Sequence, residues 1–222
     1  MSSLKDKKCK RPWPTSKAME QVYDKNLWGG ASSTFYSGIG SHDPRLVNPY
    51  IKAVSNFLMQ FESPITVCDL GCGDFNVGKQ LVKFSKKYVA VDIVQKLIDY
   101  HKKVFREDDV LFKCLDIAEN KLPKGDCALI RQVLQHLSNI EVQSVLSKLK
   151  NYKYVILTEH LPEGKFKPNL DIISGQGTRL KKQSGLDVLA APFNFNITAH
   201  EVLLSVKSTD HKGIVVTTLY TL

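Results

Sequence analysis

The chain has 222 residues, of which 43% are hydrophobic and 24% are charged, so it can bury one core and has the size of a single α/β domain. Its formal net charge is +9, no apolar run is long enough to span a bilayer, and no signal-peptide core is evident, so we expect a cytoplasmic protein. The five cysteines are scattered and lack nearby His or Cys companions, which predicts reduced thiols and not disulfides or zinc ligands.

The first segment, residues 1–22, is rich in Lys and Arg. Like charges without interleaved aromatic residues are typical of a solvated, flexible arm, although a nucleic acid is an alternative partner. We expect one domain over residues 23–222. Its first helix is predicted over 43–61, where Asp43 has the position of an N-cap, Pro44 that of the first helical residue, and apolar residues then recur at helical spacing.

The next stretch has the pattern of a nucleotide-type binding loop. Residues 65–70 are apolar enough for a buried parallel strand, and Gly71 and Gly73 let backbone N–H groups approach a ligand. Asn76 is predicted to cap a helix that carries Val77 and the apolar residues after it. By itself, such a loop does not identify its ligand.

A second strand-like run over residues 88–94 narrows the choice of ligand. It places Asp92 at about the distance past the glycines at which a carboxylate binds a ribose diol, in a dinucleotide or in S-adenosylmethionine. A dinucleotide loop needs a third glycine where this chain has Asn76. Asp69 and Asp74 would repel a pyrophosphate but attract the ammonium and sulfonium groups of S-adenosylmethionine. S-Adenosylmethionine is therefore the predicted cofactor.

The rest of the chain alternates between helical and strand periodicity. Residues 163–198 carry little regular pattern and are predicted to be a substrate-side insertion. The runs 201–207 and 213–220 are joined too closely for a helical crossover, which predicts an antiparallel hairpin. Between the second strand and the insertion, the pattern predicts a helix over residues 97–105, a third strand over 110–117 and a fourth over 126–133. A helix over 138–149, with a capping box at Ser138 and Glu141, and a fifth strand over 154–158 follow.

Five parallel strands with flanking helices and a terminal hairpin form the architecture of class I methyltransferases, a Rossmann-like α/β fold with a seven-stranded, mostly parallel sheet. Short motifs also follow one another along nearly the whole chain after Tyr23. They are Trp28-Gly-Gly, Ser37-Gly-Ile-Gly-Ser41, Cys72-Gly-Asp-Phe75, Asp92-Ile-Val94, Leu115-Asp-Ile117, Arg131-Gln-Val-Leu-Gln-His-Leu-Ser138, Asn169-Leu-Asp-Ile172 and Ala191-Pro-Phe193.

With these motifs the chain resembles the small bacterial and algal-virus methyltransferases. Several of them are associated with modification of glycans or surface polysaccharides, so the resemblance implies a sugar hydroxyl of a glycan or glycoconjugate as the methyl acceptor. The chain departs from the family at two positions. Gly71 stands where members often have Pro, and Gln132 stands where they frequently have Asp. A neutral amide at position 132 cannot act as a general base.

Methyl transfer needs a held ribose, an adenine pocket, a fixed methionine arm and in-line access for the nucleophile. We expect Asp92 to bind the ribose, and Asp69 and the glycines to hold the methionine end. Ile93 is expected to pack on the adenine and Asp116 to contact its amino group. A loop containing Gly40 is expected to close over the donor together with Trp28. The predicted cofactor-binding residues are Trp28, Gly40, Asp69, Gly71, Cys72, Gly73, Asp74, Phe75, Asp92, Ile93, Asp116, Ile117, Arg131 and Gln132.

The acceptor is expected beyond the fourth strand, at the carboxyl edge where open α/β sheets bind ligands. A sugar hydroxyl needs a base, and His136 is the first candidate, with His160 as its rival. The predicted substrate-binding residues are Gln135, Asp171 and Arg179, with Gln176 as a further candidate. No compact spacing of ligands predicts a metal site.

Two other readings of the function stay open. One keeps the donor and changes the acceptor to RNA or to a small molecule, which the basic N-terminal segment motivates in the case of RNA. The other is a non-catalytic protein of the same fold that binds an adenosyl ligand, which the amide of Gln132 motivates.

Overall fold

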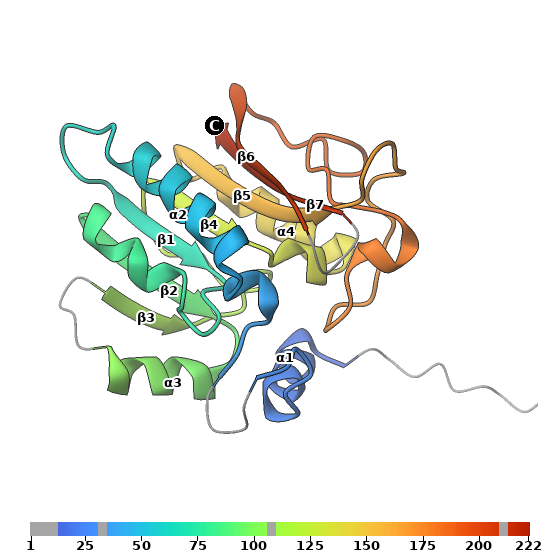
Figure 1. The fold of residues 1–222 in the computed structure, drawn as a ribbon, viewed down its shortest axis with the longest axis horizontal. Coiled ribbons are helices and arrows are strands. Elements are labelled where there is room, and N and C mark those ends of the chain that lie inside the picture. Colours follow the sequence, from blue (N-terminus) through green and yellow to red (C-terminus); the bar gives the residue numbers. More distant parts are fainter. Residues whose placement is uncertain (1–12, 31–34, 106–109, 209–212) are drawn as a thin grey trace, which may run out of the picture.

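The computed structural model describes residues 13–30, 35–105, 110–208 and 213–222, which form one twisted sheet with helices on both faces (Figure 1). The basic residues at positions 5–11 lie outside the described residues. The sheet has seven strands in the order β3-β2-β1-β4-β5-β7-β6. In chain order they are β1 (Thr66–Leu70), β2 (Lys87–Asp92), β3 (Val110–Cys114), β4 (Cys127–Arg131), β5 (Tyr154–Leu161), β6 (Ala199–Lys207) and β7 (Ile214–Thr221).

The first five strands are parallel, and only the last two run against them. Cys68 of β1 lies opposite Val89 of β2 and opposite Ala128 of β4. β7 inserts between β5 and β6 and pairs antiparallel with both. The predicted seven-stranded sheet with its antiparallel C-terminal hairpin is therefore confirmed. The strand order reverses at the β1/β4 pair, which opens a crevice at the carboxyl ends of the strands.

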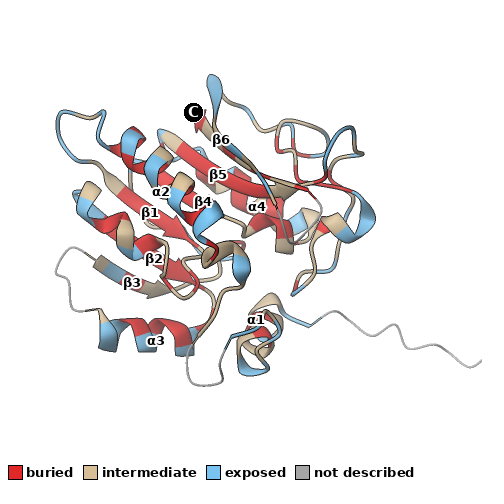
Figure 2. Cartoon of the chain, in the orientation of Figure 1, coloured by how far each residue is buried: buried red, intermediate tan, exposed pale blue. Residues whose placement is uncertain are grey.

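Each central strand buries side chains on both faces. Cys68 packs into the core cluster on the face of α4 (Asn139–Leu149), whereas the preceding Val67 packs against α2 (Pro44–Leu58) and α3 (Gln95–Val104). Figure 1 shows α2 on one side of the sheet and α4 on the other. Figure 2 shows the buried central strands and the more exposed edge strand β6. Burial on both faces explains why these strands are continuous apolar runs in the sequence.

Two of the three predicted helix caps are present, those at Asp43 and Ser138. The side chain of Asp43 accepts a hydrogen bond from the backbone N of Arg45, and Pro44 is the first residue of α2. At α4, Ser138 and Glu141 form the reciprocal capping box that their spacing predicts. None of the helices in the described parts of the chain has the length and apolar character needed to cross a membrane.

The structure corrects four of the predicted local elements. Asn76 caps no α-helix: two 3₁₀ turns follow the glycine loop, η2 (Gly78–Gln80) and η3 (Val82–Phe84), and the Asn76 amide donates to the carbonyl of Ser41 instead. The third strand ends at Cys114 and the fourth at Arg131, earlier than predicted: Asp116 forms a turn in which its Oδ1 accepts from the backbone N of Ala118, and Gln132 has a φ of +56°. The fifth strand continues to Leu161, so His160 lies within it and not after it.

The boundary predicted for the flexible arm is also wrong. Residues Thr15–Asp24 form helix α1, and Met19 and Val22 are buried in a small core cluster with Val94 and Leu97. Asp24 pairs with Lys96 of α3. In Figure 1, α1 lies on the side of the molecule toward which the strands β1, β2 and β3 point.

Between β5 and β6, residues 162–198 contain no α-helix or strand, as the pattern of that segment predicts. The regular element there is the 3₁₀ turn η5 (Arg179–Lys182). Leu186 and Val188 of this segment pack into the core on the α4 face. The insertion is therefore anchored to the domain by its second half.

Candidate functional site

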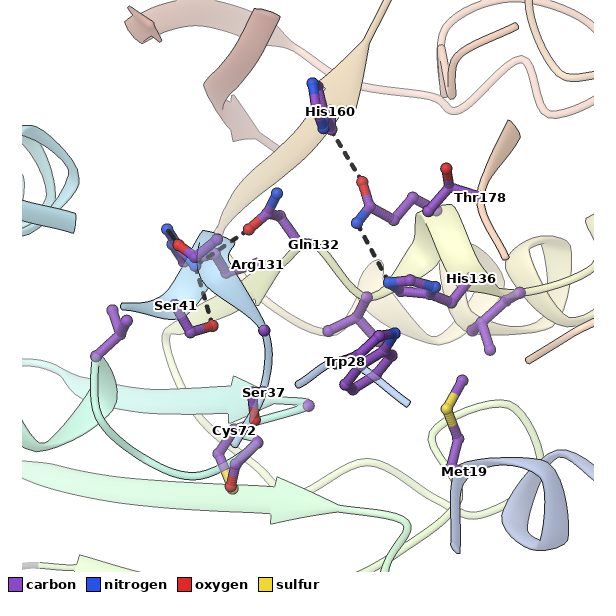
Figure 3. Close-up of a pocket in the computed structure, with 18 of the residues that line it drawn as sticks. Met19, Trp28, Ser37, Ser41, Cys72, Arg131, Gln132, His136, His160 and Thr178 are labelled. Carbon is purple, nitrogen blue, oxygen red and sulfur yellow. Dashed lines mark hydrogen bonds between the residues drawn. The ribbon is translucent and has the colours of Figure 1, made fainter. Parts of the chain in front are cut away.

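A cavity of about 1070 Å³ opens at the carboxyl ends of the strands (Figure 3). This volume is at the upper end of the range of about 300–1,000 Å³ that is usual for small-molecule sites. Its wall is built from α1, the loop 37–41, the glycine loop, the ends of β2, β4 and β5, the loop after β3, and residues 176–183 of the insertion. It has room for more than one ligand.

The part of the cavity beside the glycine loop is organised by Asp92, which is buried at the end of β2. Its Oδ2 accepts a hydrogen bond from the backbone N of Gly73 at 3.0 Å, and its Oδ1 accepts one from Val94 N at 3.0 Å. Burial raises the pKa of Asp92, and the two backbone N–H groups oppose that shift. A Cβ at Gly73 would lie 2.4 Å from the Ser37 hydroxyl, so only glycine fits this turn.

The glycine loop is tied to the loop 37–41 through Asp74. Its Oδ2 accepts hydrogen bonds from Ser37 N at 2.7 Å and from His42 Nε2 at 2.6 Å. In return, the Ser37 hydroxyl accepts a hydrogen bond from Asp74 N at 2.8 Å. Asp74 therefore holds the two loops together across the mouth of the cavity, and its carboxylate is already engaged by protein groups.

Asp69, at the base of the cavity, carries a titrating carboxyl group. Burial raises the pKa of Asp69 to about 7, although the hydroxyl of Tyr88 donates to its Oδ2 at 2.9 Å and opposes the shift. The charge of nearby Asp92 raises the pKa further, and that of Arg131 lowers it. A cation placed in this cavity would favour the ionised form of Asp69.

Arg131 and Gln132 end β4 beside the same loop. The Nη2 of Arg131 donates to the carbonyl of Gly40 at 2.6 Å, and its guanidinium lies 4.8 Å from the ring centroid of Tyr50. Gln132 has a φ of +56°, in the left-handed region that costs a non-glycine residue energy. A Cβ at Gly40 would meet the Gln132 amide at 2.3 Å. The loop therefore closes directly on this amide.

The part of the cavity wall beside the carboxyl ends of β4 and β5 carries two histidines joined by one amide. His136, in the 3₁₀ turn η4 (Leu134–His136), donates from Nδ1 to the carbonyl of Gly177 at 3.1 Å. Gln135 Nε2 lies 3.3 Å from His136 Nε2, and Gln135 Oε1 accepts from the backbone N of His160 at 3.1 Å (Figure 3). Burial lowers the pKa of His136 to about 4, so its imidazole is neutral with Nε2 as the acceptor.

Helix α1 supplies wall residues that the sequence reasoning missed. Thr15, Met19 and Tyr23 line the cavity, and the hydroxyls of Tyr23 and Ser37 lie 2.9 Å apart. The apolar residues of this helix recur at a spacing of three to four, a signal that the adjacent run of lysines obscured. Trp28, which follows α1, was predicted; its ring centroid lies 5.2 Å from that of His136.

Three predicted site residues do not line the cavity. Phe75 is 1% exposed and packs among Tyr88, Phe105 and Phe112, so it is a core residue and not a cofactor contact. Asp171 is exposed and accepts from the backbone N of Asn139 at the start of α4. Arg179 is 1% exposed and binds backbone carbonyls. These corrections remove Asp171 and Arg179 from the substrate contacts.

The other predicted site residues come together around the cavity. Since these residues are spread along the chain from Trp28 to His160, only the sheet brings them to one edge. No group of three or more metal-binding side chains is assembled among the residues that the structure describes. The wall residues are Trp28, Gly40, Asp69, Gly71, Cys72, Gly73, Asp74, Asp92, Ile93, Asp116, Ile117, Arg131, Gln132, Gln135, His136 and His160.

Comparison with known proteins finds a family match over part of the chain and solved structures of similar fold. Residues 68–152 match the family model described as "Methyltransferase domain". Among curated proteins, none matches the chain significantly. The fold is similar to that of the N-methyltransferase NodS from Bradyrhizobium japonicum WM9 in complex with S-adenosyl-L-homocysteine, with a TM-score of 0.60 and 9% identity over 82% of this chain and 90% of that chain.

Two further solved structures share the fold with different acceptors in their names. Magnesium protoporphyrin IX methyltransferase (ChlM) from Synechocystis PCC 6803 has a TM-score of 0.58 and 15% identity, over 94% of this chain and 99% of that chain. Human N-acetylserotonin methyltransferase has a TM-score of 0.51 and 17% identity, over 90% of this chain and 61% of that chain. Residues 68–152 thus resemble a methyltransferase domain, and the fold of the described chain is similar to that of these solved methyltransferases. These similarities do not define its acceptor.

Proposed function

We propose that this protein is an O-methyltransferase that transfers a methyl group from S-adenosylmethionine to a sugar hydroxyl of a glycan or glycoconjugate. S-Adenosylmethionine supplies an electrophilic methyl group on its sulfonium when bound. The cavity fits this donor because Gly71 and Gly73 leave room that side chains would fill, and because Asp69 and Asp92 present carboxylates to its cationic and ribose groups. Asp116 and Ile117, beside them, are proposed to receive the adenine.

The observation that carries the choice of acceptor is the wall beyond the donor side. It combines the amides of Gln132, Gln135 and Gln176 with the indole of Trp28. An amide offers a donor and an acceptor side by side, as neighbouring sugar hydroxyls require, and an aromatic face covers the apolar side of a pyranose ring. Together with the motifs shared with glycan-modifying methyltransferases, this wall favours a saccharide.

His136 is proposed as the group that accepts the proton of the acceptor hydroxyl. Its Nδ1 is fixed by Gly177, which leaves the Nε2 lone pair toward the Gln135 amide. A hydroxyl that displaces the amide would meet a neutral imidazole. The pKa of about 4 makes His136 a weak base in the absence of ligands. Its contribution is therefore to orient the acceptor hydroxyl. It then receives the hydroxyl proton, which becomes acidic as the bond from the acceptor oxygen to the methyl carbon forms. His160 is the rival base.

The test is methyl transfer from radiolabelled S-adenosylmethionine to a panel of oligosaccharides, nucleotide sugars, small-molecule phenols and amines, and RNA oligonucleotides. The proposal expects label on one saccharide class and its loss when Asp92 is changed to Asn. Label on phenols or amines alone would move the assignment to a small-molecule methyltransferase. A donor that binds without turnover on any acceptor would favour the non-catalytic alternative.

The basic residues before position 13 motivate RNA as an alternative acceptor, and a deletion variant tests it. Deletion of residues 1–12 leaves α1 intact in sequence and removes Lys5, Lys7 and Lys8 with their basic neighbours. If RNA is the acceptor, its binding should weaken steeply with salt and be lost in the deletion variant. For a saccharide acceptor, the deletion should leave kcat/KM unchanged.

A further inference from the structure

One short segment of the insertion, residues 175–179, binds every carbonyl group of the turn that carries His136. The backbone N of Gly175 and the guanidinium of Arg179 are the donors. Both guanidinium Nη atoms take part, so the contacts extend over the whole turn and not over one residue. The carbonyls of Leu134, Gln135, His136 and Leu137 accept at 3.2, 3.5, 3.0 and 2.8 Å.

The same segment also fixes the imidazole itself. The carbonyl of Gly177 accepts from His136 Nδ1 at 3.1 Å. Backbone and side chain of His136 are therefore both bound between positions 175 and 179. A 3₁₀ turn of three residues has too few internal hydrogen bonds to hold its own geometry, so these external contacts set it.

Arg179 is well suited to this position. It is 1% exposed, and its Nη2 also donates to the Asn139 side chain at 2.6 Å, which links the turn to the start of α4. The guanidinium is a planar fork with donors in fixed directions, and it stays charged when buried, so it binds several carbonyl groups at once. Arg179 does not line the cavity, and it acts on ligands only through the turn η4.

We propose that Arg179 is a positioning residue, which fixes η4 and thereby holds the imidazole of His136 and the amide of Gln135 in place in the acceptor wall. The inference rests on the proposed function of this wall. It predicts that loss of Arg179 impairs transfer without impairing the donor side, because the donor residues lie on the glycine loop and on β2. A displacement of about 1 Å in such a site lowers the rate by roughly 100-fold.

Three variants test the proposal. Arg179→Met removes all the guanidinium contacts. We expect kcat, calculated per mole of protein that binds the donor, to fall about 100-fold, while the Kd for S-adenosylmethionine changes less than about 2-fold. Arg179→Lys keeps the charge at a single nitrogen, and a loss of about 10-fold is expected. The control is Lys182→Met, on the same turn η5, whose exposed ammonium binds the carbonyl of Asp171. Wild-type kcat in Arg179→Met would overturn the proposal.

A second measurement does not depend on the acceptor. In the wild type, the Nδ1 proton of His136 is held by Gly177, so nuclear magnetic resonance should show a slowly exchanging imidazole proton. We expect this protection to be lost in Arg179→Met and weakened in Arg179→Lys. Unchanged protection in both variants would overturn the positioning role. If no saccharide is methylated by the wild type, the proposed function fails while this measurement still decides the role of Arg179.

Discussion

The backbone N–H of Gly73 donates to Oδ2 of Asp92 at 3.0 Å and so joins the glycine loop after β1 to the end of β2. The other carboxylate oxygen accepts from Val94 N at 3.0 Å. Both oxygens are thus oriented before a ligand arrives, and each keeps a lone pair for the cavity. This preorganisation reduces the ordering cost of binding.

Asp92→Asn should weaken donor binding. The amide replaces one acceptor oxygen by an NH₂ group, which would face a backbone N–H and can accept nothing from a ribose. We expect the Kd for S-adenosylmethionine to rise 10- to 100-fold, or about 1.4–2.8 kcal/mol, as measured by calorimetry. The control is Asp99→Asn on α3, an exposed residue that accepts from Gln95. An equal Kd in both variants would remove Asp92 as the ribose ligand.

Gly71→Ala should destabilise the glycine loop by more than strain alone. Gly71 has a φ of +96°, and a Cβ there would lie 2.3 Å from Val133. Gly164→Ala isolates the strain term, because Gly164 has a φ of +74° with nothing within 4 Å. Urea unfolding should show a loss of about 1 kcal/mol for Gly164→Ala and a clearly larger loss for Gly71→Ala. Similar losses would mean that Val133 moves aside.

His136→Gln should leave donor binding intact and lower kcat by 10²- to 10⁴-fold on the cognate acceptor. The control is His200→Gln on the exposed strand β6. Because burial lowers the pKa of His136 to about 4, the wild-type kcat should show no titration step near pH 6.5 from this residue. Unchanged turnover would transfer the role of the base to His160, which His160→Gln then tests.

Donor binding should strengthen as the pH rises through about 7. Burial raises the pKa of Asp69 to about 7, so the carboxyl group is largely protonated at pH 6 and ionised at pH 8. The cationic donor prefers the ionised form, and its Kd should therefore fall over this range. Asp69→Asn stays neutral and should bind with a Kd that no longer changes with pH. A pH-dependent Kd in that variant would assign the effect to another group.

Glu159 should make the protein less stable at alkaline pH. Burial raises its pKa to about 8, whereas the unfolded chain has an ordinary value of about 4.3. Between these values the folded protein holds a proton that the unfolded chain has released, so the free energy of unfolding falls as the pH rises. Glu159→Gln removes the titrating carboxyl group. The free energy of unfolding should then depend less on pH, as measured by urea unfolding at pH 5.5, 7 and 8.5. Exposed Glu119→Gln should leave the slope unchanged.

The placement of the glycine loop beside Asp92 was largely predictable from the sequence, because these residues are local. Gly71, Gly73 and Asp92 lie at the ends of two adjacent parallel strands, and the direction of a parallel strand fixes which end meets the ligand. Helix α2 was equally readable from Asp43 and Pro44. By contrast, Phe75 belongs to the same short motif as the glycines, yet its ring turns into the core, which the order of residues alone does not reveal.

The acceptor side depends on contacts between distant segments. Arg179 reaches η4 from more than forty positions along the chain, so neither its burial nor its carbonyl partners leave a local signal. Helix α1 was missed for a related reason: its stability comes from the core cluster that buries Met19, whereas its own sequence follows a run of lysines.

The sequence by itself determined the alternation of strands and helices, the glycine turn and the acidic residue at the end of β2, since periodicity and turn chemistry act over a few residues. Only the tertiary structure decided which polar side chains of the insertion line the cavity and which hold it together. That choice depends on contacts with segments far away in the chain: Arg179 is buried and donates to the carbonyl of Leu137, whereas the exposed Asp171 accepts from the backbone N of Asn139 at the start of α4.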